Sequence, residues 1–212
     1  MEHANAIPKQ ADSSKEGVRE RTTLDHIIER LASMELPGKE YLEQYMHYKW
    51  RVNHKPRTMK GSFTSIVLFL TFYGASGKSD ITRLERSDLE AFIEHEQDRG
   101  MYISTVKVRM ASVIAFVHFF MEQDILSPLL LKKTIRLKLP ETLPRAMNPS
   151  DVKKLIGSID VVRDRALILL LLRTGIRIGE ALSLTMNDID LAEKKIHVLE
   201  GEKNSMGRVV YL

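Results

Sequence analysis

The sequence predicts a mainly α-helical chain that ends in a small antiparallel β-hairpin. Apolar residues recur at helical spacing through residues 40–124 and again through 148–184, which indicates two sets of amphipathic helices. Prolines and basic residues separate these sets between residues 126 and 147. β-Branched residues cluster in 195–199 and 208–212, on either side of a polar turn, as they do in hairpins.

Residues 1–37 predict a flexible N-terminal segment, because its first part is polar and has no periodicity. A short amphipathic helix is expected over 23–34, before the turn at Pro37-Gly38. The start of the chain lacks the apolar stretch that forms the centre of a secretory signal. The seven-residue apolar run 166–172 is far shorter than the roughly 20 residues that cross a bilayer. We therefore expect a soluble, cytoplasmic protein with no membrane partner.

A first helical domain is expected over residues 38–125. Its four helices are predicted near residues 40–53, 57–72, 87–100 and 104–120. Ser87 followed by Glu90 three positions later has the pattern of a reciprocal capping box, which predicts a helix beginning there. Gly100 is expected to supply the left-handed residue that ends the same helix.

Residues 126–147 predict a linker, because Pro128, Pro140 and Pro144 disfavour regular structure. Its first part contains no acidic residue and four basic ones, Lys132, Lys133, Arg136 and Lys138. Such a segment can follow a phosphate backbone or can simply be solvated, and the sequence leaves both possibilities open.

A second domain is expected over residues 148–212. Asn148 followed by Pro149 has the pattern of an N-cap with proline in the first helical turn. The helix over 163–174 is apolar nearly all round, so we expect it in the centre of this domain. A short helix over 178–184 then leads to the hairpin.

The most specific motif follows the apolar helix. The chain reads TGIRIGEALSL from Thr174 to Leu184, followed by an acidic segment and the hairpin. This pattern resembles the opening of the catalytic domain in tyrosine recombinases, the phage integrase family. The resemblance implies a helical, SAM-like core-binding domain before the N-terminal part of an α+β catalytic domain. It also assigns Arg177 to the scissile phosphate, with Glu180 as its companion.

The chemistry of the family explains this residue choice. A tyrosine attacks a DNA phosphodiester, and negative charge on the non-bridging oxygens must be stabilised. A guanidinium donates two parallel hydrogen bonds to such oxygens and keeps its charge. The resemblance therefore implies that Arg177 is catalytic and that neither a metal nor another cofactor is needed.

The hairpin turn carries a second catalytic candidate. The family has a lysine there that protonates the departing 5′ oxygen, and Lys203 is the nearest match. Family turns usually read Gly-Lys-Gly-x-(Lys/x)-x-Arg, whereas this turn reads GEKNSMGR from Gly201 to Arg208 and is slightly longer. A proton donor must reach the leaving oxygen, so an exposed lysine without a catalytic role stays open as the alternative.

Two helix starts in the first domain resemble DNA-facing parts of the family's core-binding domain. They read HKPRTMK and MYISTVKVR. Hydroxyls, amides and cations at such positions contact phosphates and orient a protein on DNA. The candidate DNA-binding residues are Arg57, Thr58, Lys60, Ser104, Thr105 and Lys107. Each of them is equally the kind of residue that caps a helix or carries a solvated charge.

In the family, the remaining active-site residues lie after the hairpin: a His-x-x-Arg element, a further histidine or tryptophan, and the nucleophilic tyrosine. The His54–Arg57 sequence has the first pattern but lies upstream of Arg177, so we interpret it as coincidence. Tyr211 falls in the second hairpin strand, so we do not expect it to be the nucleophile. We therefore expect this chain to be unable to cleave DNA alone.

The expected function is that of a DNA-binding fragment of a site-specific tyrosine recombinase. Its expected partners are double-stranded DNA and, in a synaptic tetramer, other recombinase protomers. The alternative is a non-catalytic DNA-binding module that occupies or competes for recombination sites. A helical protein-interaction domain is a third class, against which the Thr174–Arg177 motif argues.

Overall fold

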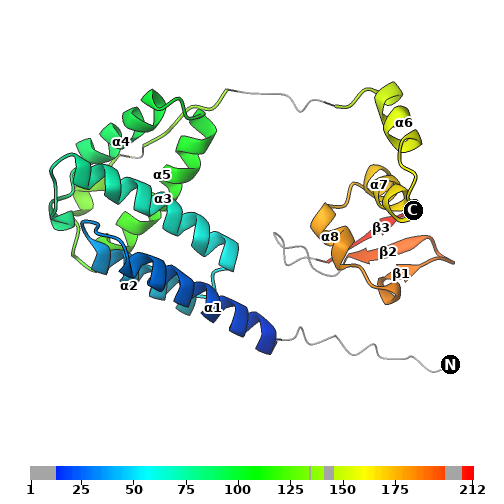
Figure 1. Ribbon diagram of the computed structural model, residues 1–212, viewed down its shortest axis with the longest axis horizontal. Coiled ribbons are helices and arrows are strands. Elements are labelled where there is room, and N and C mark those ends of the chain that lie inside the picture. Colours follow the sequence, from blue (N-terminus) through cyan, green and yellow to red (C-terminus); the bar gives the residue numbers. More distant parts are fainter. Residues whose placement is uncertain (1–12, 134, 141–145, 199–206) are drawn as a thin grey trace. The chain divides into compact units, whose positions relative to one another are not determined.

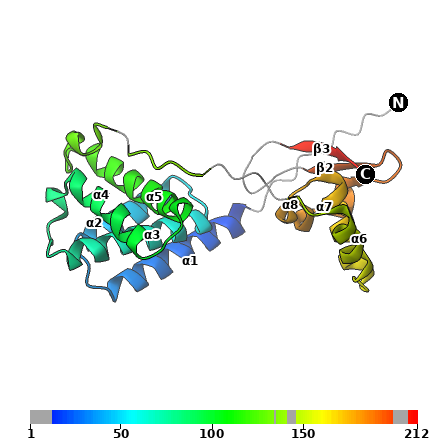
Figure 2. The same cartoon turned by 90° about the horizontal axis from the view of Figure 1, so that it is seen from above.

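The computed structural model describes residues 13–133, 135–140, 146–198 and 207–212. The chain divides into two compact units, residues 1–141 and 142–212 (Figures 1 and 2). The first unit is helical, and the second combines helices with a small antiparallel sheet. The predicted fold class, mainly α with a β-hairpin, is confirmed.

The first unit contains five α-helices and two short 3-10 turns in its described residues. These are α1 (Ser13–Ala32), α2 (Lys39–Arg51), α3 (Pro56–Ala75), η1 (Ile81–Arg83), α4 (Arg86–Asp98), α5 (Ile103–Met121) and η2 (Pro128–Leu131). The four predicted helices of residues 38–125 correspond to α2, α3, α4 and α5, with ends within a few residues. Gly100 has a φ of 75° and follows α4, as predicted.

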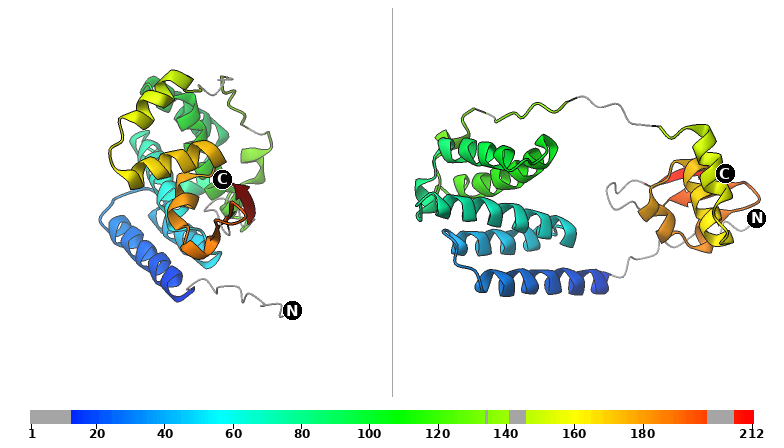
Figure 3. Two further views of the ribbon diagram at one scale, coloured as in Figure 1. Left: turned by 90° about the vertical axis from the view of Figure 1, so that its right-hand side faces the viewer. Right: turned by 45° about the horizontal axis from the view of Figure 1, so that its top comes forward.

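The described part of the N-terminal segment, residues 13–37, is more ordered than predicted. Residues 1–37 were expected to be flexible apart from a short helix, but α1 runs over twenty residues. Its apolar residues Leu24, Ile27 and Leu31 are buried in the core of the unit. Helix α1 packs against α2 and α3 (Figure 3), and this apolar stripe explains why the segment folds.

The core of the first unit is rich in aromatic side chains. Phe69 of α3 and Phe92 of α4 meet edge to face, with 5.3 Å between ring centroids. Phe116 of α5 makes the same kind of contact with Tyr45 of α2, at 5.4 Å. Aromatic pairs of this geometry add to the stability that burial provides.

Helix α5 is long and apolar enough, by length and composition, to cross a membrane. In this fold it is a core helix instead. Its residues Val106, Met110, Val113, Phe116 and Val117 are buried, and α5 packs against α2, α3 and α4. A helix in the centre of a globular unit needs the same apolar composition, which accounts for this feature of α5.

The N-cap of helix α4 is Glu85, two residues before the predicted cap at Ser87. Ser87 and Glu90 were expected to form the capping box, but the Glu85 backbone N–H donates to the Asp88 carboxylate at 3.0 Å. Asp88 also accepts from Lys78 Nζ at 2.6 Å. Glu90 instead pairs with Arg86 one turn earlier, at 2.7 Å. Asp88 captures the free amide because it lies three positions after Glu85.

The predicted linker of residues 126–147 is partly folded onto the first unit. Leu126 and Leu130 are buried in its core, and Ile135 and Leu137 pack against the same core. Arg86 donates from Nη1 to the Lys133 carbonyl oxygen. Apolar residues spaced between the basic ones therefore hold the first part of this segment on the helices.

The second unit contains three α-helices, one 3-10 turn and three strands in its described residues. These are α6 (Pro149–Gly157), α7 (Val162–Thr174), α8 (Ile178–Ser183), η3 (Met186–Asp188), β1 (Ile189–Asp190), β2 (Lys195–Val198) and β3 (Arg208–Tyr211). The Asn148 side chain caps α6, as predicted, by accepting from the Ser150 N–H at 3.1 Å.

The three strands form an antiparallel sheet in the order β1-β2-β3. Val198 faces Arg208 in the β2–β3 register, which confirms the predicted hairpin strands. Strand β1 was not predicted, because two residues are too few to show an alternating pattern. Its Ile189 pairs with Ile196 of β2.

Helix α7 does not lie in the centre of its unit, contrary to the prediction. None of its residues is fully buried, and Leu169 and Leu172 are exposed. Leu170 and Leu171 pack on the small core formed by Ile176, Ile196 and Val198. Among the described residues, α7 therefore has a packing partner on one side of its circumference, although its apolar residues extend around it.

Candidate functional site

The candidate site begins at the end of α7, where the chain reverses direction. Gly175 has a φ of 64°, in the left-handed region that favours glycine and ends the helix. Thr174 Oγ1 donates to the Leu170 carbonyl at 2.7 Å and accepts from the Ile176 N–H at 3.4 Å. Ile176 is buried in the small core. This tight connection leaves Arg177 at the N-cap of α8.

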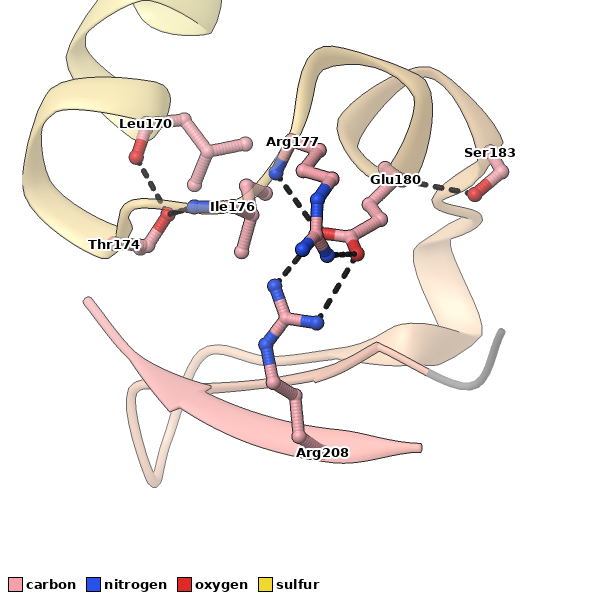
Figure 4. Close-up of polar contacts among 7 residues, drawn as sticks. All are labelled: Leu170, Thr174, Ile176, Arg177, Glu180, Ser183 and Arg208. Atoms are coloured by element: carbon pink, nitrogen blue, oxygen red, sulfur yellow. Dashed lines mark hydrogen bonds and ion pairs between the residues drawn. The ribbon is translucent and has the colours of Figure 1, made fainter. Parts of the chain in front are cut away.

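Glu180 holds Arg177 in two ways (Figure 4). Its Oε2 accepts from the Arg177 backbone N–H at 2.8 Å, and its Oε1 accepts from Arg177 Nη1 at 2.9 Å. The spacing of three residues at a helix start permits both contacts. The two residues that the sequence selected together therefore lie in direct contact.

Arg208 reaches the same carboxylate from β3, and the sequence analysis did not select it. Its Nη2 donates to Glu180 Oε2 at 2.7 Å, and its Nη1 donates to Oε1 at 3.1 Å. Two parallel bonds between a guanidinium and a carboxylate are the strong, orienting form of this interaction. The available signal was the arginine that ends the family's turn pattern, which Arg208 matches.

Two arginines keep Glu180 ionised. The hydrogen bonds from Arg208 are the largest cause, followed by the Arg177 backbone N–H, and they lower the pKa of Glu180 to about 2 although desolvation opposes them. The same contact raises the pKa of Arg208. Because the pKa of Glu180 is lower in the folded state, its stabilising effect is present above its ordinary pKa near 4.5 and is lost as the pH falls toward 2.

Exposure differs sharply within this trio. The Glu180 side chain is 2% exposed, whereas the side chains of Arg177 and Arg208 are 54% and 39% exposed. Among the described residues, Glu180 is the side chain that pairs with the Arg177 guanidinium. The trio carries two positive charges and one negative charge, which leaves a net charge of one positive unit. The Arg177 guanidinium is half exposed and uses only Nη1 among the described contacts, so it is suited to bind an anion.

The other predicted site residues are spread over the chain. Lys203 lies outside the described residues. Arg57, Thr58 and Lys60 are exposed in the first turns of α3. Ser104 and Lys107 are exposed in the first turns of α5, and Thr105 between them is partly buried. Neither first turn contains an acidic residue, which leaves the positive end of each helix dipole uncompensated. In the parts of the chain that the structure describes, no three His, Asp or Glu residues group as metal ligands.

Comparison with known proteins agrees with this geometry. Residues 145–212 match the Phage integrase family. The tyrosine recombinase XerD of Listeria monocytogenes serotype 4b is 34% identical over 124 residues, which cover 55% of this chain and 41% of that protein. The tyrosine recombinase XerA of Pyrococcus furiosus is 27% identical over 199 residues, which cover 91% of this chain and 58% of that protein.

Solved structures show the same fold. The XerH site-specific recombinase bound to its difH substrate has a TM-score of 0.60 at 19% identity, covering 91% of this chain and 57% of that one. The Tn1549 transposon integrase in complex with transposon right end DNA has a TM-score of 0.63 at 21% identity, covering 84% and 61%. The chain spans about half the length of the curated relatives it matches. The family match therefore covers residues 145–212, and the relatives that the chain resembles over longer stretches are tyrosine recombinases.

Proposed function

We propose that this chain is a DNA-binding part of a site-specific tyrosine recombinase and that Arg177 binds a phosphate of the DNA backbone. The observation that carries the proposal is the Arg177 guanidinium, which is half exposed while its partner carboxylate is buried and already satisfied by Arg208. The DNA complexes of XerH and of the Tn1549 integrase, which share this fold, support DNA as the ligand.

The chemistry of Arg177 fits phosphoryl transfer in the whole protein. Negative charge grows on the non-bridging oxygens as a nucleophile attacks phosphorus, and a fixed guanidinium stabilises that charge. Arg177 is held at its backbone N–H and at Nη1, so its side chain is already oriented before DNA binds. In this proposal Arg177 is a catalytic residue, and Lys203 remains the candidate proton donor.

We assign sequence-independent DNA contacts to the first unit. The exposed cations and hydroxyls at the starts of α3 and α5 would contact phosphates and orient the protein on the duplex. In this assignment residues 38–125 form the core-binding domain, 126–147 the connection, and 148–212 the catalytic part. We further propose that the protein acts in the cytoplasm or nucleoid, together with other recombinase protomers bound to the same DNA.

Replacing Arg177 by alanine is expected to weaken binding of the chain to duplex DNA by about 10- to 100-fold, the size of a charge-assisted hydrogen bond. The dependence of log affinity on log salt concentration should become shallower by about 0.9, because one phosphate contact is lost. Fluorescence anisotropy with a labelled duplex across a salt series measures both quantities.

The matched control is Arg163→Ala, which removes the same charge from the same unit. The Arg163 side chain is 86% exposed, and among the described residues it pairs with its neighbour Asp164, at 2.8 Å. We expect its replacement to change the affinity by less than about threefold, as for a solvated surface charge. Equal losses in the two variants would mean that net charge, and not a phosphate site at Arg177, governs binding.

A further inference from the structure

Arg208 occupies an unusual place in the candidate site. It comes from β3, twenty-eight positions after Glu180, yet both of its terminal nitrogens donate to the Glu180 carboxylate, at 2.7 and 3.1 Å. Glu180 in turn contacts Arg177 through both of its oxygens. The buried carboxylate therefore joins a residue of the hairpin to the residue that faces a phosphate in the proposed function.

The charges of the trio determine what Arg177 can offer to an anion. Without Arg208, the Arg177–Glu180 pair would have no net charge, and a phosphate near Arg177 would also meet the negative Glu180 carboxylate. Like charges at close range repel, so this carboxylate would oppose phosphate binding. With Arg208 present, the carboxylate is neutralised from its other side and the trio retains one positive charge.

We propose that Arg208 is a positioning residue that neutralises and immobilises Glu180, so that Arg177 keeps a free positive charge and a fixed orientation for phosphate. This inference rests on the proposed function of Arg177. In this proposal Arg208 acts through Glu180, to which both of its terminal nitrogens donate (Figure 4). Arg177 uses only Nη1 for the same carboxylate among the described contacts, which leaves its other donors for a ligand.

The proposal makes a prediction about pH that a purely structural role would not make. Among the described residues, the charged groups that face Glu180 are Arg177 at the start of α8 and Arg208 on β3. In the wild type, the pKa of Glu180 is about 2, so its charge is constant between pH 7 and pH 4. Removing Arg208 removes the largest cause of that lowering, and the pKa of Glu180 should rise. Protonation on acidification would then relieve the repulsion of phosphate.

The test compares three variants of the whole chain in the same duplex-binding measurement, with thermal melting as a check on folding. Arg208→Gln should weaken binding about tenfold at pH 7, and this loss relative to wild type should become smaller as the pH falls toward 4. Arg208→Lys keeps the charge but cannot make the two parallel hydrogen bonds, so it should weaken binding less than Arg208→Gln does. Glu180→Gln combined with Arg208→Gln restores one net positive charge and should regain most of the affinity at pH 7.

The outcomes separate this inference from the proposed function. If Arg177→Ala has no effect, the phosphate site itself is absent. If Arg177→Ala weakens binding but the Arg208→Gln loss persists at pH 4 and in the double variant, the positioning role is overturned, and Arg208 acts on DNA directly or only on the fold. Should Arg208→Gln fail to fold, the lysine variant still decides: a loss beyond about tenfold in a folded Arg208→Lys chain contradicts the neutralising role.

Discussion

Replacing Phe92 by alanine is expected to lower the free energy of unfolding of the first unit by about 3–5 kcal/mol. The Phe92 side chain on α4 is fully buried. Its ring meets Phe69 edge to face at 5.3 Å and lies 5.6 Å from Phe72, both on α3. Alanine would leave a cavity between the two helices and remove both aromatic contacts. Urea denaturation followed by far-UV circular dichroism measures the change.

The control for this substitution is Tyr102→Ala. Tyr102 precedes α5 and is largely exposed, so its removal should change the stability by no more than about 0.5 kcal/mol. Because α3 and α4 belong to the unit that carries Arg57 and Lys60, loss of its core should also reduce DNA binding near the lowered melting temperature. A Phe92→Ala chain as stable as the Tyr102→Ala chain would show that α4 does not pack on α3 as described.

Replacing Glu96 by alanine is the second large expected effect, a loss of about 3 kcal/mol in the first unit. Glu96 on α4 is fully buried and accepts from Arg99 Nη1 at 2.8 Å. It also accepts from Arg109 Nη1 of α5, so it ties the two helices together. Its loss would leave two guanidiniums without the carboxylate that balances their charge, one of them mostly buried. Denaturant unfolding again measures the effect.

Glu94→Ala serves as the matched control for Glu96, because it removes an exposed glutamate from the same helix. It should cost no more than about 0.5 kcal/mol. Glu96→Gln keeps the shape and an acceptor oxygen, so we expect it to be less harmful than alanine. Equal tolerance of alanine at Glu94 and Glu96 would show that Glu96 does not tie α4 to α5.

Local signals in the sequence were sufficient for most helices. Asn148-Pro149 and Gly175 mark helix ends because capping and left-handed geometry depend on a few neighbouring residues. The Arg177–Glu180 contact was also accessible, since it spans three positions of one helix start. These features need no knowledge of distant parts of the chain.

The remaining features depend on long-range contacts. Arg208 meets Glu180 only because the hairpin folds back toward α8, and no local pattern encodes that contact. The burial of Leu24 in α1 depends on α2 and α3, so composition alone suggested a flexible segment. The apolar circumference of α7 predicted a central helix, but burial requires neighbours on every side. The cap at the start of α4 was predicted at the wrong residue. Asp88 lies three positions after Glu85 and accepts from its backbone N–H, so the box forms there and not at Ser87.

The most direct test of the central claim observes the Arg177 side chain while DNA is added. Arginine Nε–Hε resonances can be followed by NMR in the isotope-labelled chain, with Arg177→Lys and Arg163→Lys used to assign the two signals. We expect the Arg177 resonance to shift and to exchange more slowly with water as duplex DNA is added, while that of the solvated Arg163 stays in place. An unchanged Arg177 resonance at saturating DNA would contradict a phosphate site at this residue.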